Sequence, residues 1–145
     1  MDPSLNSVKI LDLPFDAANN GDLTVMESGS HIPFSIARVF VVRGHAGSTR
    51  GKHAHKLCTQ FLTCPYGMVE VICTDGRQLR KYILDKPDVG LLIPPGIWAQ
   101  QNYLVKDSVL TVLCDRIYES QDYIREYDQY IAEFIKVNNA NERKV

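Results

Sequence analysis

The sequence is poor in three features that could each define its class: cysteine, an excess of charge of one sign, and long hydrophobic runs. It has four cysteines and no C-x-x-C pair, so we expect neither a disulfide framework nor a zinc site. With 16 basic and 17 acidic residues, the net charge is −1, unlike the basic balance of a general nucleic-acid binder. No hydrophobic run approaches the roughly 20 residues of a membrane span. We therefore expect no nucleic-acid partner and no membrane partner.

The first residues, MDPSLNSVKILDLPF, also lack the basic start and apolar stretch of a secretory signal peptide. We therefore expect a cytoplasmic protein. The four cysteines fit that compartment, because each lies in an apolar, strand-like segment where a buried free thiol is the usual state. With 45% hydrophobic and 23% charged residues, the chain is expected to form one soluble globular domain over residues 1–145.

Short strand-like segments separated by glycine and proline turns dominate the chain. The expected strands are 8–13, 23–27, 36–42, 56–64, 68–73, 78–84, 91–93, 97–103 and 109–114. Asp75-Gly76 is a strong hairpin signal, so 68–73 should pair with 78–84. Residues 44–51 carry three glycines and are expected to form a loop. Many short strands with a single helix predict a β-sandwich, jelly roll or barrel.

One helix is expected near the end of the chain, where the hydrophobic period changes. Ser120 is a candidate for its N-cap. Apolar residues at helical spacing then fall on one face: Ile124, Tyr127, Ile131, Phe134 and Ile135. The polar residues 137–145 are expected to fray.

The most informative segment runs from Gly47 to Gly67 and carries two of the four histidines. His53 and His55 are two residues apart, so on a strand both imidazoles point to the same face. In a jelly roll that face can line the interior, which would place both rings in one pocket. The full pattern, G-x5-H-x-H-x4-Q-x6-G, resembles the first cupin motif, with Gln60 in place of the usual glutamate.

A second cupin-like segment, GLLIPPGIWA from Gly90 to Ala99, keeps the P-x-G turn of the second cupin motif. It has Ala99 where cupins place a third metal-binding histidine. A methyl group here, and an amide at Gln60, cannot replace an imidazole and a carboxylate as metal ligands. We therefore expect no metal. Without one, His53 and His55 are free to take up and return protons, because an unperturbed histidine has a pKa near ~6.5.

Four segments, two of them within the motifs described above, resemble one particular family. They are IPFSIARVF at 32–40, RGKHAHK at 50–56, GLLI at 90–93 and YESQDYIREY at 118–127. In these segments the chain is similar to the cupin-type nucleotide-sugar 3,4-ketoisomerases, which act on dTDP-4-keto-6-deoxyglucose. The resemblance extends over roughly residues 5–135. It implies an all-β fold, a cupin-type double-stranded β-helix (jelly roll) with a C-terminal helix.

The resemblance also implies an activity in deoxysugar and polysaccharide biosynthesis. The keto group moves from carbon 4 to carbon 3 of a dTDP-sugar through an enediol, with no cofactor. His53 is the expected base and His55 the expected acid or shuttle; such groups contribute about 10²–10⁴-fold each. The implied partners are the dTDP-sugar substrate and a second copy of the chain, in a homodimer with exchanged N-terminal strands.

The expected substrate-binding residues surround these histidines. They are Arg38, Arg50, Gln60, Trp98, Gln101 and Tyr118. The two arginines suit the diphosphate or the developing oxyanion, because a guanidinium binds phosphate through two parallel hydrogen bonds. Gln60, expected on the strand of the two histidines, suits the sugar hydroxyls. Trp98 suits stacking on the nucleotide base.

Three other functions stay open at this point. Family members often carry histidines just after the tryptophan, where this chain has Ala99-Gln100-Gln101-Asn102. That difference admits a related sugar-nucleotide epimerase and leaves the stereochemistry at carbon 4 open. A non-catalytic cupin that binds a sugar nucleotide is the second alternative, although it would not need both His53 and His55. A metal-dependent cupin oxygenase is the third.

Overall fold

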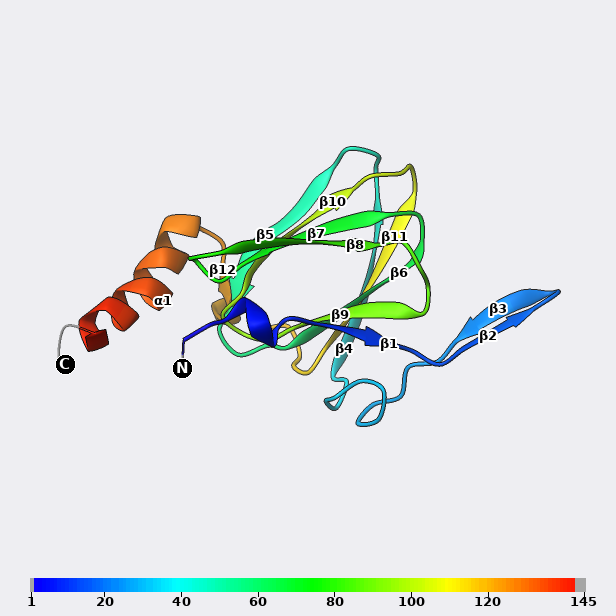
Figure 1. Cartoon of the computed structure of the whole chain (residues 1–145), viewed down its shortest axis with the longest axis horizontal. Coiled ribbons are helices and arrows are strands. Elements are labelled where there is room, and N and C mark those ends of the chain that lie inside the picture. Colours follow the sequence, from blue (N-terminus) through cyan, green and yellow to red (C-terminus); the bar gives the residue numbers. More distant parts are fainter. Residues whose placement is uncertain (1, 143–145) are drawn as a thin grey trace.

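Two five-stranded antiparallel sheets form the body of the protein in this computed structural model, which describes residues 2–142 and the side chains of residues 2–135 (Figure 1). The first sheet contains, in spatial order, β1 (Lys9–Asp12), β9 (Val89–Ile93), β6 (Gln60–Tyr66), β11 (Ser108–Cys114) and β4 (Arg38–Gly44). The second contains β12 (Tyr123–Ile124), β5 (Thr49–His55), β10 (Trp98–Tyr103), β7 (Val69–Thr74) and β8 (Leu79–Leu84). The remaining elements are the 3-10 turns η1 (Leu5–Ser7) and η2 (Ser120–Asp122), strands β2 (Phe15–Ala18) and β3 (Gly21–Thr24), and helix α1 (Tyr127–Glu142).

The core lies between the two sheets and follows from the alternation of side chains along each strand. In β7, Val69, Val71 and Cys73 are buried, whereas the residues between them are only half-buried. In β4, Phe40 and Val42 pack against the same core. All four cysteines are buried free thiols, as predicted. The all-β jelly roll with a C-terminal helix is confirmed.

The predicted hairpin around Asp75-Gly76 is also confirmed. β7 and β8 pair antiparallel, with Thr74 opposite Leu79. The Asp75 side chain accepts hydrogen bonds from the backbone N–H groups of Arg77 and Gln78, at 2.9 and 2.8 Å, and these bonds close the turn. It also accepts one from Leu5 N–H at 3.2 Å and so fixes the start of the chain to this hairpin.

Two predictions about the segment around the histidines were wrong. Residues 44–51 are not all loop, because β5 already begins at Thr49, which pairs with Asn102 of β10. The strand predicted at 56–64 begins only at Gln60. The reason is that the chain crosses from one sheet to the other between these strands. There Lys56 N–H and Leu57 N–H are hydrogen-bonded to residue 122 rather than to a neighbouring strand.

The predicted helix start at Ser120 was wrong as well. Residues 120–122 form η2, and Tyr123 and Ile124 pair with β5, so α1 begins only at Tyr127. Ile124 therefore belongs to a strand, although it packs in the same cluster as Tyr130 of the helix. The side chains after residue 135 lie outside the described residues, as do residues 143–145, so the expected fraying of 137–145 stays a prediction.

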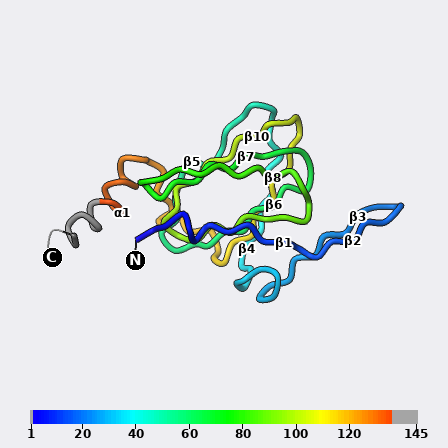
Figure 2. Tube along the Cα trace, in the orientation of Figure 1, coloured from blue at the N-terminus to red at the C-terminus, as the bar shows by residue number. Residues whose placement is uncertain are grey.

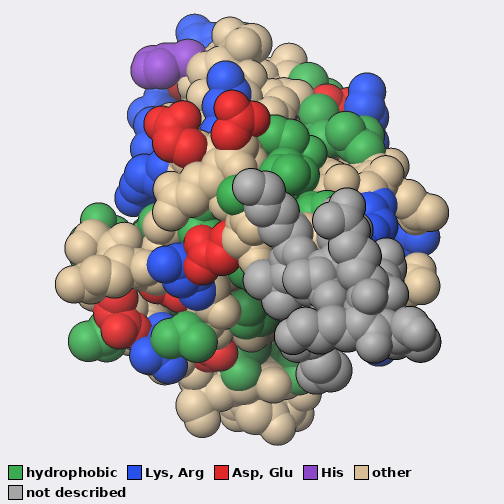
Figure 3. Space-filling model, turned by 90° about the vertical axis from the view of Figure 1, so that its left-hand side faces the viewer, with side chains coloured by type: hydrophobic (Ala, Val, Ile, Leu, Met, Phe, Trp, Pro, Cys, Tyr) green, Lys and Arg blue, Asp and Glu red, His purple; other side chains and the backbone are tan. Residues whose placement is uncertain are grey.

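On the face that carries α1, acidic and basic side chains lie interspersed around hydrophobic ones (Figure 3). This mixture agrees with the nearly balanced charge of the sequence. None of the helices among the described residues has the length and hydrophobicity needed to cross a membrane.

A hairpin of β2 and β3 extends away from the two sheets, at the end opposite α1 (Figures 1 and 2). The sequence predicted a strand at 23–27; β3 occupies 21–24, and β2 was not predicted. All residues from 14 to 23 are exposed, including Leu23 at 59% and Phe15 at 41%. A two-stranded hairpin is at best marginally stable alone. This arm therefore suits packing against another molecule.

Candidate active site

Strand β5 places His53 and His55 on the same side, as their spacing predicted. Their ring centroids are 4.9 Å apart and the rings are perpendicular. Just before them, Gly51 (φ 85°) and Lys52 (φ 56°) adopt left-handed backbone conformations, opposite a register shift in β10. A β-bulge of this kind changes the direction of the neighbouring side chains and is common next to active sites. Gly51 also needs its missing side chain, because a Cβ there would lie 2.5 Å from Oε1 of Gln101.

A cavity of about 90 Å³ lies between the two sheets beside His53. Its polar lining comes from Arg50, His53, Gln60, Gln101 and Tyr103. Its apolar lining comes from Phe40, Val42, Leu62, Leu110 and Val112. The cavity thus brings together four residues that the sequence predicted for the site. Tyr103 was not predicted; its hydroxyl is buried without a partner among the described residues.

Gln60 is not on the strand of the two histidines, which corrects the sequence prediction. It begins β6 in the other sheet and lines the cavity from that side. Its amide Nε2 lies 3.6 Å from Sγ of Cys114. The prediction failed because residues 56–59, where the chain crosses from β5 to β6, have a composition typical of a strand.

The usual cupin metal site does not fit these residues. Ala99 is the residue directly opposite His53 in the β5–β10 pairing, and its methyl group cannot bind an ion. The amide of Gln60 faces a thiol instead of supplying a carboxylate. His53 and His55 alone would hold a metal poorly.

Asp122 is a residue of this site that the sequence analysis did not select. Its Oδ2 lies 2.8 Å from Nδ1 of His55, and the side chains of the pair are only 5% and 6% exposed. Leu57 N–H donates to Oδ1 at 2.6 Å and holds the carboxylate in place. The carboxylate favours a proton on Nδ1, which leaves the lone pair on Nε2. Within the described residues Nε2 is buried and has no partner, so it is free to exchange a proton.

Burial keeps both imidazoles unprotonated at neutral pH. Burial, reinforced by the neighbouring His55, lowers the pKa of His53 to about 4. Burial also lowers the pKa of His55, although the hydrogen bond and charge of Asp122 oppose it. For Asp122, burial alone would raise the pKa, but hydrogen bonds from His55 and Leu57 leave it below its usual value. At neutral pH the site therefore holds two neutral imidazoles and one carboxylate.

Arg38 lies near His55, between the buried Cys114 and the exposed Tyr118. Its Nη2 lies 3.4 Å from Sγ of Cys114 and 3.4 Å from the hydroxyl of Tyr123, whose ring packs on His55. The guanidinium also lies 5.5 Å from the centroid of the exposed Tyr118 ring. None of the ion pairs found among the described residues includes Arg38. A half-buried cation without an acidic partner is suited to an anionic ligand.

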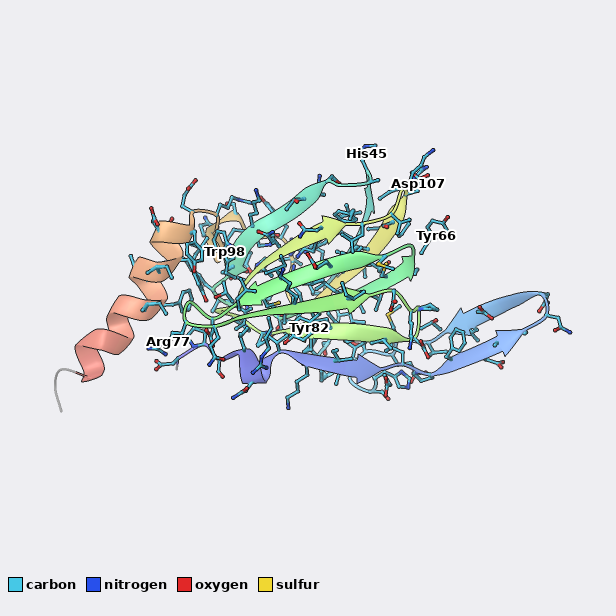
Figure 4. All side chains as sticks on the ribbon, turned by 45° about the horizontal axis from the view of Figure 1, so that its top comes forward. His45, Tyr66, Arg77, Tyr82, Trp98 and Asp107 are labelled. Atoms are coloured by element: carbon cyan, nitrogen blue, oxygen red, sulfur yellow. The ribbon has the colours of Figure 1, made fainter. Side chains whose placement is uncertain are left out.

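Trp98 lies outside the cavity, whereas Arg50 lines it. Trp98 does not line the cavity; it lies at the α1 end of the sheets, whereas His45, Tyr66 and Asp107 lie at the far end (Figure 4). The Trp98 ring packs against the tyrosines of α1, with centroids 5.2 and 5.7 Å away. Its stacking on a nucleotide base stays a prediction. Arg50 lines the cavity but is itself exposed, so it is accessible to a ligand.

Known proteins resemble the chain over nearly its whole length. The TDP-4-oxo-6-deoxy-alpha-D-glucose-3,4-oxoisomerase of Aneurinibacillus thermoaerophilus is 37% identical over 135 residues, 92% of this chain and 93% of that protein. The sugar 3,4-ketoisomerase QdtA of Thermoanaerobacterium thermosaccharolyticum, solved in complex with TDP, is 35% identical, with a TM-score of 0.87 over 92% of this chain and 98% of that chain. The TDP-quinovose 3,4-ketoisomerase WlaRB of Campylobacter jejuni is 33% identical, with a TM-score of 0.81 over 87% of this chain and 98% of that chain.

A family model agrees with these relatives. It is described as "WxcM-like, C-terminal" (FdtA), and it matches residues 6–135. This range includes both sheets, the histidines of β5 and Asp122. The chain belongs to the FdtA family, WxcM-like, C-terminal.

Proposed function

We propose that this protein is a sugar-nucleotide 3,4-ketoisomerase that acts on a dTDP-4-keto-6-deoxyhexose without a metal. The observation that carries the proposal is a pair of adjacent neutral imidazoles, of which His53 lines the cavity and His55 is anchored by Asp122. The relatives support the substrate class. A histidine-to-asparagine variant of QdtA, 34% identical to this chain, has been solved in complex with TDP-4-keto-6-deoxyglucose.

The first chemical step moves the proton of carbon 3 to the oxygen on carbon 4 and forms an enediol. The carbon-bound proton is acidic because it lies next to the keto group at carbon 4. His53, neutral because its pKa is lowered to about 4, takes this proton and delivers it to the oxygen on carbon 4. The guanidinium of Arg38 is placed to balance negative charge on the substrate during the transfer.

The second step moves the hydroxyl proton of carbon 3 to carbon 4. His55 takes this proton at Nε2, the carboxylate of Asp122 stabilises the imidazolium that forms, and His55, as the acid, delivers the proton to carbon 4. The keto group is then on carbon 3, and both histidines are neutral again. Protons balance without an oxidant or reductant, so the site needs no redox cofactor for this reaction.

The proposal is tested by proton NMR of dTDP-4-keto-6-deoxyglucose with chelator-treated protein in deuterated water. We expect a 3-keto product that carries deuterium at carbon 4, and its coupling constants will give the stereochemistry. Exchange without a 3-keto product would reject the ketoisomerase in favour of an epimerase. No exchange at all would reject activity on this substrate and favour a non-catalytic binder.

We further propose that the protein is a homodimer in which the arm of β2 and β3 packs on the partner. The exposed Phe15 and Leu23 of this arm support it. Sedimentation is expected to give twice the chain mass of 16.4 kDa, and Leu23→Asp is expected to shift the equilibrium to monomer. Leu79→Asp is a matched control, because Leu79 on β8 is equally exposed, at 59%. A monomeric wild-type protein, or equal dissociation of both variants, would contradict the packing of the arm on the partner.

We also propose that the enzyme works in the cytoplasm, in the synthesis of deoxysugars for polysaccharides, as one cupin domain over residues 1–145. Its four buried free cysteines support a reducing compartment. The match of the family model to residues 6–135 supports a single domain.

A further inference from the structure

A cluster of potential metal ligands lies behind His55, on the side away from its free Nε2. It consists of His55, Cys58 and Asp122, all buried, and one ligand atom of each lies within 4.8 Å of the others. Nδ1 of His55 is the imidazole nitrogen on this side, because it faces Asp122. The sequence did not reveal the cluster, because Asp122 is 67 residues from His55 and no cysteine pair marks it.

The donor set and its size suit zinc. Zinc binds thiolate, imidazole and carboxylate in tetrahedral sites, with ligand atoms roughly 3.3–3.8 Å apart. Closing this cluster on an ion therefore needs ligand atoms to approach one another by about 1.5 Å at most. Leu57 N–H already holds the carboxylate of Asp122, which is the kind of outer contact that orients metal ligands.

The charges near the cluster also allow a divalent cation. Arg38 touches Cys114, and Arg125 lies over the ring of Tyr123, so both guanidinium groups oppose a further positive charge. The carboxylate of Asp122 and the thiolate that Cys58 forms on binding carry two negative charges, which balance the two positive charges of the ion.

We propose that this cluster is an inhibitory zinc site, formed by His55, Cys58 and Asp122. Binding releases the thiol proton of Cys58 to solvent and moves the proton of His55 from Nδ1 to Nε2. A metal-bound imidazole keeps its proton on the other nitrogen, so His55 loses the free lone pair that faces the site. Zinc would then stop the proton relay while leaving the cavity and Arg38 in place. Only the inhibition rests on the proposed function; the binding does not.

The binding is tested directly, with purified chelator-treated protein and buffered zinc sulfate. We expect one zinc ion per chain by elemental analysis, and reactivation by a chelator after loss of isomerase activity. Cobalt(II) in place of zinc should show the thiolate-to-metal absorption of a tetrahedral site. Absence of a stoichiometric ion would overturn the site whether or not the protein is an isomerase. Binding without loss of activity would overturn the inhibition.

Variants of the cysteines identify the ligand. Cys58→Ser is expected to keep the basal activity, to weaken zinc binding by at least about 10²-fold and to lose the cobalt–thiolate band. Cys64→Ser is the matched control, since Cys64 is an equally buried thiol outside the cluster. Cys58→Ala, with a melting curve of each variant, separates loss of a ligand from loss of folding. Unchanged zinc binding in folded Cys58 variants would contradict the proposal.

Discussion

Replacing His53 by asparagine is expected to lower kcat by about 10²–10⁴-fold, because His53 is the proposed base for the proton on carbon 3 and an amide cannot take up that proton. The loss should leave folding unchanged. His53 is only half-buried, and its Nδ1 has no partner among the described residues, so asparagine breaks no hydrogen bond at that atom. The measurement is the rate of deuterium uptake into dTDP-4-keto-6-deoxyglucose, together with a melting curve.

The matched control is His45→Asn. His45 is exposed on a loop at the end of the sheets away from α1, so its replacement should not change the rate (Figure 4). His55→Asn should also lose activity but, unlike His53→Asn, should lower the melting temperature. It leaves the buried carboxylate of Asp122 without its histidine partner, which costs about 1–3 kcal/mol. Wild-type exchange by His53→Asn would reject the assignment of the base.

The part of the site that could be predicted follows from local spacing. Two histidines two residues apart must share a face of a strand, and the strand alternation around them places that face inward. Arg50 and Gln101 were expected only from the resemblance to the family, and the structure places them opposite each other in the β5–β10 pairing. An all-β fold was predictable because short alternating strands, glycine turns and a hairpin signal favour it, whereas the choice of a jelly roll came from the cupin motif and the resemblance.

The rest depends on contacts between distant segments. Asp122 lies in the stretch predicted as helix, and nothing local marks it as the partner of His55. In the fold its side chain binds Leu57 N–H and its backbone oxygen accepts from Lys56 N–H. These bonds stop β5, send the chain across to β6 and delay the helix to Tyr127. The errors at Gln60 and Ser120 and the missed residue thus all fall where the segment around Asp122 meets the end of β5.

Asp122→Asn is expected to be nearly as damaging as the loss of a histidine, about 10²-fold or more in kcat. The carboxylate accepts two hydrogen bonds, from Leu57 N–H at Oδ1 and from His55 Nδ1 at Oδ2. Asparagine has only one oxygen for these two donors. If that oxygen stays with the backbone, the amide NH₂ faces Nδ1 and forces the proton of His55 onto Nε2. The lone pair that the relay needs is then lost.

The same variant should change the pH profile in a direction that a merely structural role does not give. The charge of Asp122 raises the pKa of His55 against the effect of burial, so its removal lowers that pKa further. The acid limb of kcat/KM should therefore move to lower pH, and nitrogen NMR should show the Nε2–H tautomer. Asp115→Asn is the control, because Asp115 also accepts from a backbone N–H, that of Thr59, at 2.9 Å. If Asp122→Asn lowers the melting temperature but leaves the tautomer and the acid limb unchanged, Asp122 only holds the fold and does not position His55.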